Sequence, residues 1–287
     1  MKPKRIEQYH LHKLYPQKLQ FEIYDLNKYR NKNRDKAAQP HSHSYYQIIW
    51  FFCNEGTHTV DFKTYDIKEN TILFISKDQI HAFDNNLNVT GWLIHFNESF
   101  FAHNDMDIFL KYNVFKSPKK PCYIIPKGNL ETASTYLKLM KNELSNRNRF
   151  GYEDIIRFTL KSFLIGLERI HRTNNKQQLK LNNAYELQFY KFKELIEAHY
   201  KDGLSVKDYA SLLNISSKTL TTISKNIVNK SPSIIIAERT VLQAKRLLKF
   251  TTLQIGEVAF KIGFEDPSYF VKFFKRHVGI SPSGYRG

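Results

Sequence analysis

Two segments near the end of the chain follow one residue pattern, about 50 positions apart. In each, a small alanine precedes a turn residue, Asn or Gly, that tolerates a left-handed backbone, and a bulky apolar residue follows it. A repeated pattern constrains the fold strongly, because it requires two copies of one supersecondary unit. The matching positions are Ala210 and Ala259, Asn214 and Gly263, Ile215 and Phe264 and, with one residue inserted in the second turn, Leu220 and Phe270, Ile223 and Phe273, Lys225 and Lys275, and Ser231-Pro232 and Ser281-Pro282.

The first copy carries the signals of a short helix, a tight turn and a second helix. Ser205 begins the short helix with Asp208 three positions later, a capping box with Asp in place of Glu or Gln. Ser216 and Ser217 end the turn and can cap a second helix from Lys218 to about Val228. Helix-turn-helix units of this kind present their second helix to the major groove of DNA.

A long helix separates the two copies. Pro232 suits the first helical position after a Ser231 cap, and apolar spacing continues to Phe250. Its roughly 18 residues span about 27 Å. The second helices of the two copies could therefore enter successive major-groove segments roughly 34 Å apart on one side of a duplex.

The chain is strongly basic, with a formal net charge of +17 over 287 residues and a pI of about 9.6. This charge favours polyanionic partners, of which nucleic acid is the commonest. The excess is spread along the whole chain, so charge alone does not distinguish DNA binding from a general compositional bias. Neither of the two cysteines stands in a CxxC motif, and no apolar run is long enough to span a membrane. These features predict a cytoplasmic protein with reduced thiols.

Patterning divides the chain into four parts. Residues 1–38 form a basic, polar leading segment, residues 39–171 a β-domain followed by helices, residues 172–183 a polar linker, and residues 184–287 the helical domain. Short β-branched and aromatic runs separated by Gly, Asn and Asp mark the β-domain as a barrel or sandwich. The runs are Tyr45–Phe52, Thr57–Phe62, Thr71–Ile75 and Gly91–Phe96.

Two helices are predicted after the strands, near 130–144 and 152–171. The second has apolar residues around much of its circumference, so it must be buried on more than one side. One interpretation is that it packs only on its own β-domain. The other is that it also forms the seam of a homodimer.

The segment Ile255–Pro282 (IGEVAFKIGFEDPSYFVKFFKRHVGISP) resembles the signature of AraC/XylS-family transcription regulators. The resemblance extends over about Tyr185 to Arg286, and the order of strands before it resembles the family's cupin-type sensor domain more loosely. It implies an α+β chain of two domains: an N-terminal cupin-like β-barrel followed by helices, and an all-α C-terminal domain with two helix-turn-helix units joined by a long helix.

The resemblance also implies a function. We expect a sequence-specific, DNA-binding transcription regulator, controlled by a small-molecule effector in the barrel and acting as a homodimer. RNA polymerase would be a further partner of an activator. We expect no enzymatic activity, no cofactor and no membrane partner.

Residue roles carry over from the family position by position. In the second unit Ser268 and Lys272 would face the bases, with Tyr269 and Arg276 nearer the backbone, and Lys275 would also contact DNA. In the first unit the matching positions are Lys218, Thr221, Thr222 and Lys225. Here the chain departs from the family, because Thr222 stands where a long basic side chain is frequent and Ser224 where an aromatic is. Thr lacks the bidentate reach of Arg to guanine, so we expect weaker reading by the first unit.

The spacing of His41, His43, Gln47 and His81 resembles the metal constellation of cupins. Gln47 stands where metal-binding cupins usually carry Glu, and a neutral amide is a poorer ligand. We therefore predict a small-molecule pocket and no metal, with aromatic walls that supply area and polar groups that fix orientation. The predicted lining is His41, His43, Gln47, Phe51, His81 and Trp92.

Two alternatives remain open at this point. A metal-dependent cupin enzyme tethered by its helices would require a stoichiometric transition metal. A nonspecific DNA-binding protein is favoured by the diffuse charge and by Thr222.

Overall fold

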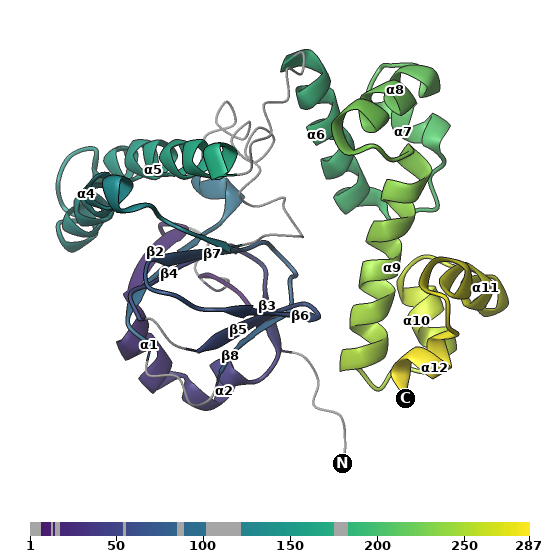
Figure 1. Cartoon of the computed structure of the whole chain (residues 1–287), viewed down its shortest axis with the longest axis horizontal. Coiled ribbons are helices and arrows are strands. Elements are labelled where there is room, and N and C mark those ends of the chain that lie inside the picture. Colours follow the sequence, from purple (N-terminus) through teal and green to yellow (C-terminus); the bar gives the residue numbers. More distant parts are fainter. Residues whose placement is uncertain are drawn as a thin grey trace. The chain divides into compact units, whose positions relative to one another are not determined.

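The computed structural model describes residues 7–12, 14, 18–53, 56–84, 89–101, 122–174 and 183–287 (Figure 1). Contacts divide the chain into an N-terminal unit, Glu7–Gln178, and a C-terminal unit, Leu179–Gly287. Within the described ranges, no helix is both long enough and apolar enough to cross a bilayer.

The N-terminal unit contains two five-stranded sheets. The first has the order β1 (Glu7–Tyr9), β3 (His41–His43), β8 (His81–Phe83), β5 (Thr57–Val60) and β6 (Lys63–Asp66). The second has the order β10 (Cys122–Ile124), β7 (Thr71–Ile75), β4 (Tyr46–Phe51), β9 (Gly91–Phe96) and β2 (Phe21–Asp25). All neighbours are antiparallel except β1 and β3.

The predicted β-domain is confirmed, but its strands form two open sheets instead of one closed barrel. Among the described strands, the edge strands β10 and β2 of the second sheet do not pair with each other or with the first sheet. The chain changes sheet between His43, the last residue of β3, and Tyr46, the first residue of β4. Closure would require continuous hydrogen bonding around the ring, which these pairings do not supply.

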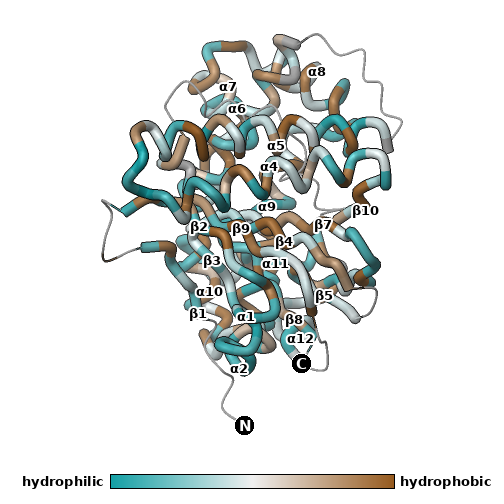
Figure 2. The backbone as a smooth tube through the Cα atoms, turned by 90° about the vertical axis from the view of Figure 1, so that its left-hand side faces the viewer, coloured by the Kyte–Doolittle hydropathy of each residue, from teal (hydrophilic) through white to brown (hydrophobic). Residues whose placement is uncertain are grey.

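The second sheet is apolar on both faces. Ile48 and Trp50 of β4 belong to a core shared with the helices α4 (Lys127–Ser145) and α5 (Tyr152–Asn174). Ile49 and Phe51 point the other way, into a core shared with strands of the first sheet. Figure 1 shows α4 and α5 on one side of this sheet, and Figure 2 shows the brown, apolar segments of β4 and β7 below them. Burial of each large apolar side chain contributes about 2 kcal/mol, and this double burial fixes the register of the strands.

Residues 18–38 belong to the N-terminal unit and do not form a separate leading segment. β2 pairs with β9 from Phe21 to Asp25, and the helices α1 (Leu26–Lys32) and α2 (Arg34–Ala38) follow directly. Asp25 caps α1 by accepting a hydrogen bond of 2.9 Å from the Lys28 backbone N–H. Leu26 is fully buried against the core between the sheets. The polar composition of the segment hid this amphipathic face. A 3-10 helix, η1, spans Glu98–Phe100.

The C-terminal unit is helical throughout its described residues, as predicted. Figure 1 shows α9 running from one helix-turn-helix unit to the other. The helices are α6 (Asn183–His199), α7 (Val206–Leu212), α8 (Ser217–Val228), α9 (Pro232–Phe250), α10 (Ile255–Lys261), α11 (Pro267–Val278) and α12 (Pro282–Arg286).

The two predicted repeats have the same backbone turn. The Ile215 N–H donates to the Ala210 carbonyl over 3.0 Å, and the Phe264 N–H donates to the Ala259 carbonyl over the same distance. Asn214 and Gly263 both have left-handed φ angles, +54° and +93°. The serines Ser231 and Ser281 cap the helices that follow, each with Pro at the first helical position. The left-handed turn expected at Asn214 and Gly263 is therefore confirmed, and Ile215 and Phe264 after it are half-buried.

Candidate DNA-reading helices and a buried histidine cluster

One side of helix α11 is polar and basic, and the opposite side packs into the core through aromatic side chains. Asp266 caps its start by accepting a hydrogen bond of 2.8 Å from the Ser268 N–H. Phe270 and Phe274 are fully buried and join a core with α9 and α10. Its exposed side chains include the five residues of this helix that were predicted to contact DNA, namely Ser268, Tyr269, Lys272, Lys275 and Arg276.

These five side chains share a helix surface because of their spacing. Ser268, Lys272 and Arg276 recur every fourth residue, which places them along one side of the helix. Lys275 and Arg276 in the last turn add positive charge where the helix dipole favours it. Tyr269 is 59% exposed, with its ring 5.8 Å from that of Phe264. The arrangement offers cations for phosphates and a short polar side chain for a base edge.

Helix α8 is built in the same way but carries less charge. Leu220 and Ile223 are buried, and Lys218, Thr222 and Lys225 are exposed while Thr221 is half-buried. The Thr221 and Thr222 hydroxyls donate hydrogen bonds of 2.9 and 3.1 Å to the carbonyls of Ser217 and Lys218. With its hydrogen engaged, each hydroxyl can only accept from a ligand, and its methyl group suits a thymine methyl.

Ser224 occupies the position that Phe274 fills in the second unit. Its side chain is fully buried, and its hydroxyl has no hydrogen-bond partner among the described residues. A buried hydroxyl without a partner costs free energy, and a small side chain fills less of the core than an aromatic one. The first unit therefore has a less well packed core than the second unit, as well as less positive charge on its reading helix.

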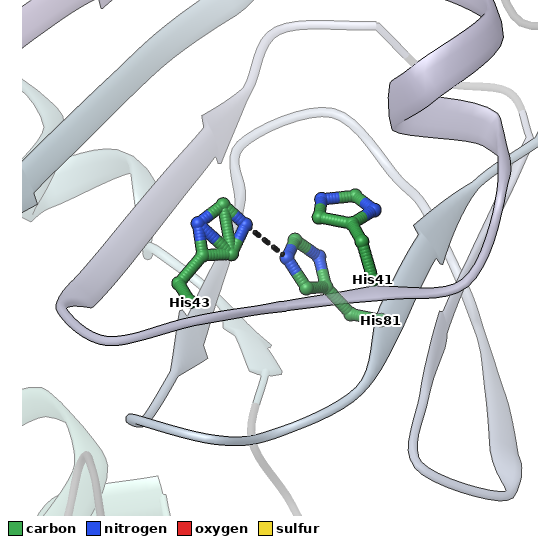
Figure 3. Close-up of side chains that lie close together, drawn as sticks. All are labelled: His41, His43 and His81. Carbon is green, nitrogen blue, oxygen red and sulfur yellow. Dashed lines mark hydrogen bonds between the residues drawn. The ribbon is translucent and has the colours of Figure 1, made fainter. Parts of the chain in front are cut away.

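The N-terminal unit holds five buried histidines between its sheets, each at most 5% exposed. His41 and His43 lie on β3, His58 on β5, His81 on β8 and His95 on β9. His81 connects its neighbours, because its Nε2 lies 2.7 Å from His43 Nε2 and its Nδ1 lies 3.1 Å from His58 Nε2. Figure 3 shows His41, His43 and His81 converging.

Burial holds these histidines in the neutral form. Desolvation, reinforced by neighbouring positive groups, lowers the pKa of His58 and of His95 to about 3. The same causes lower the pKa of His41 and hold those of His43 and His81 well below the usual range. A neutral imidazole carries one N–H and one lone pair. The cluster can therefore hydrogen-bond a polar ligand or coordinate a metal ion.

The structure brings five of the six predicted pocket residues to the space between the sheets. Gln47 is buried and pairs in register with His95, so it faces the same interior as the histidines. Phe51 is fully buried in the inner core, with its ring 6.2 Å from that of His58.

Trp92 lies on the opposite face of the second sheet, so its assignment to the pocket was wrong. It packs in the outer core, and the Lys141 Nζ of α4 lies 3.4 Å above its ring. Side chains alternate along β9, and Leu93 and His95 take the inner face instead. The sequence analysis missed His58 and His95. Their signal was the alternation with inward apolar neighbours, His58 with Val60 and His95 with Leu93.

Comparison with known protein families gives two matches. The family described as "AraC-like ligand binding domain" matches residues 24–104, and that described as "Helix-turn-helix domain" matches residues 209–287. The first of these ranges contains the histidine cluster, and the second contains both α8 and α11.

Individual relatives match over different lengths. The chain is 30% identical over 111 residues to the uncharacterized HTH-type transcriptional regulator YisR of Bacillus subtilis, a match that spans only 39% of each chain. It is 24% identical over 251 residues to the HTH-type transcriptional activator RhaS of Mannheimia succiniciproducens, which covers 86% of this chain and 88% of that one. A solved regulator with an AraC-type DNA-binding domain from Chromobacterium violaceum is 25% identical over 37% of this chain and 94% of that one, with a TM-score of 0.33.

A β-rich ligand-binding unit followed by tandem helix-turn-helix units defines a DNA-binding transcription regulator. The two matches, together with relatives named as HTH-type transcriptional regulators, support an AraC-family regulator.

Proposed function

We propose that this protein binds a specific DNA sequence as a homodimer and that a small molecule held between the two N-terminal sheets controls its activity. The observation that carries the DNA-binding part is the exposed row Ser268, Lys272 and Arg276 on a helix anchored by two fully buried phenylalanines. A rigid helix with polar side chains on one face can read base edges, while cations beside them contact phosphates.

Both units would contact DNA in each subunit. With two groove segments read, one subunit covers roughly 17–20 base pairs. Helix α11 supplies most of the specificity, because α8 offers threonines whose hydroxyl hydrogens are already bonded within the helix. Such a protein works in the cytoplasm, and RNA polymerase is a further partner if the regulation is activation.

An exposed apolar row on helix α5 is the observation that supports a homodimer. It packs on its own sheet through Leu160 and Phe163, yet it also exposes Ile155 and Phe158, 44% and 60% accessible. Ile165, half-buried, continues this row at helical spacing. A second copy of the same helix would cover the row and form a two-fold seam.

The effector site lies among the inner histidines, with Gln47 and Phe51 as neighbours. Neutral imidazoles and one amide would orient the polar groups of a small molecule, and the aromatic rings would supply apolar contact. Three nitrogen atoms there, His43 Nδ1, His58 Nδ1 and His95 Nε2, are buried with no hydrogen-bond partner in the described structure.

The test first selects, from random DNA duplexes, one that the full chain enriches. It then compares the affinity of the chain for this duplex with its affinity for a duplex of the same base composition in shuffled order. At about 150 mM salt, specific binding should exceed nonspecific binding by at least about 1000-fold. Equal affinity for the two duplexes would contradict the proposal and favour nonspecific DNA binding.

A further inference from the structure

We propose that His41, His43 and His81 form a binding site for one divalent transition-metal ion, such as Zn²⁺ or Co²⁺. One ligand nitrogen from each residue lies within 4.8 Å of the other two, and all three side chains are buried (Figure 3). The strand pairing supplies this geometry, because His41 of β3 is directly opposite His81 of β8 and His43 follows two residues later on the same strand. The site is independent of the proposed DNA specificity.

The orientation of His41 is fixed by a second contact. Its Nδ1 lies 2.8 Å from the Gln39 carbonyl oxygen. A carbonyl can only accept, so the proton of neutral His41 is on Nδ1 and the lone pair is on Nε2. A metal-ligating histidine characteristically donates its other ring N–H to a carbonyl or a similar acceptor.

His81 has the same kind of support from His58. When its Nδ1–H donates to His58 Nε2, 3.1 Å away, the His81 Nε2 lone pair points toward His43. An ion at this point replaces the His43–His81 hydrogen bond. Zn–N bonds of about 2.0–2.1 Å place tetrahedral ligand nitrogens about 3.3 Å apart. The two Nε2 atoms, now 2.7 Å apart, would have to separate by about 0.6 Å. The His41 nitrogen, which lies within 4.8 Å of the other two ligand atoms, would have to move to a similar separation.

Hydrogen bonds inside the cluster leave it incompletely satisfied. His43, His81 and His58 form a row in which each neutral ring has one N–H, and the outer Nδ1 atoms of His43 and His58 are both buried without partners. Whichever way the protons point, the row ends in one buried N–H and one buried lone pair. An ion bound to the Nε2 atoms of His43 and His81 would place the His43 proton on Nδ1, so the two end nitrogens of the row would stay without partners among the described residues.

The chemistry of the donors selects the ion. Three neutral imidazoles suit Zn²⁺ and its first-row neighbours, whereas Mg²⁺ and Ca²⁺ require oxygen ligands. Gln47, on the facing sheet, contributes no negative charge. The bound ion would keep its full charge and a fourth position, which suits water or an anionic oxygen of a ligand. From Gln47 alone we expected a pocket without a metal, and the contacts of His41 with Gln39 and of His81 with His58 favour a metal site instead.

The test uses the full-length chain, stripped of metal and titrated with Co²⁺ and Zn²⁺. We expect one equivalent of Co²⁺ to produce the intense visible absorption of a four-coordinate nitrogen site, and Zn²⁺ to displace it. His81→Gln should abolish this spectrum. His95→Gln, which changes a buried histidine of the same interior, should retain one equivalent, as should the control His199→Gln at the end of α6 in the other unit.

His58→Gln should weaken Co²⁺ binding without abolishing it, because His58 orients His81 and does not bind the ion. Its affinity for Co²⁺ should fall about 10–100-fold while the stoichiometry stays at one. If His81→Gln does not fold, His41→Gln at the edge of the cluster carries the test, with circular dichroism as the measure of folding. The proposal is overturned if the unaltered chain gives no four-coordinate spectrum, or if a folded His41 or His81 variant retains it.

Discussion

Gly263 lies directly against the backbone carbonyl of Lys201, so that a Cβ on Gly263 would fall 1.8 Å from the Lys201 oxygen. This contact joins the turn of the second helix-turn-helix unit to the loop that follows α6. Gly263 also has a φ angle of +93°, which L side chains rarely adopt. Two separate constraints therefore require glycine here, and the family pattern at this position has a local physical cause.

Gly263→Ala should lower the free energy of unfolding of the C-terminal unit by more than about 2 kcal/mol, because it adds a steric clash to the backbone strain. Gly279→Ala is the matched control. Its φ of +90° is nearly the same, but nothing lies within 4 Å of the added Cβ. It should lose only about 1 kcal/mol. Thermal unfolding of both full-length variants measures the difference, and equal losses would show that the Lys201 contact is unimportant.

Ser224→Ala should leave stability unchanged or raise it by up to about 1 kcal/mol, because it removes a buried hydroxyl that has no partner. Ser216→Ala, eight residues earlier, is the contrasting change. The Ser216 hydroxyl caps α8 by accepting from the Thr219 N–H over 3.0 Å, so its loss should cost about 1 kcal/mol. Denaturant unfolding distinguishes the two, and a large loss in Ser224→Ala would reveal a hydrogen bond to water or to a ligand.

Phe158→Glu should weaken the proposed homodimer, because it places a charge in the exposed apolar row of α5. A loss of at least about 2 kcal/mol, or roughly 30-fold in the dissociation constant, is expected for a central aromatic residue. Phe150→Glu is the control, since Phe150 is fully exposed in the turn before α5. Sedimentation equilibrium measures both variants. An unchanged dimer in Phe158→Glu would place the interface elsewhere.

Lys272→Ala and Thr222→Ala should differ in their effect on DNA binding. Loss of Lys272 should relax the sequence preference at one or two positions, by about 1–3 kcal/mol of discrimination. Loss of Thr222 should change discrimination much less, because its hydroxyl hydrogen is held by the Lys218 carbonyl. Competition binding against single-base variants of the selected duplex tests this, and the reverse order of effects would assign the main reading to α8.

The C-terminal fold could be predicted from the sequence because its determinants are local. Caps such as Ser205 and Ser231, and the left-handed positions Asn214 and Gly263, act within a few residues of where they stand. The arrangement of the β-strands could not be predicted in the same way. The change of sheet between His43 and Tyr46 depends on pairing partners far along the chain, and a pattern of alternation does not identify those partners.

The histidine site shows the same limit. His41, His43 and His81 could be chosen from spacing, but Trp92 was placed on the wrong face because the outer face of the second sheet is apolar as well. Alternation within β9 distinguishes Trp92 from His95 only after one residue of the strand has been assigned to a face. The orientation of His81 by His58 depends on two strands 23 residues apart and leaves no local signal.

Sequencing of the DNA fragments that the protein enriches from random duplexes at about 150 mM salt tests most directly whether α11 carries the sequence specificity. We expect a motif of two blocks about one helical turn apart, in which the block contacted by α11 is strongly constrained and the block contacted by α8 is weakly constrained. Repeating the selection with Lys272→Ala should blur the first block and leave the second as it was. Enrichment of no motif, or a motif that Lys272→Ala leaves intact, would contradict the claim that α11 carries the specificity.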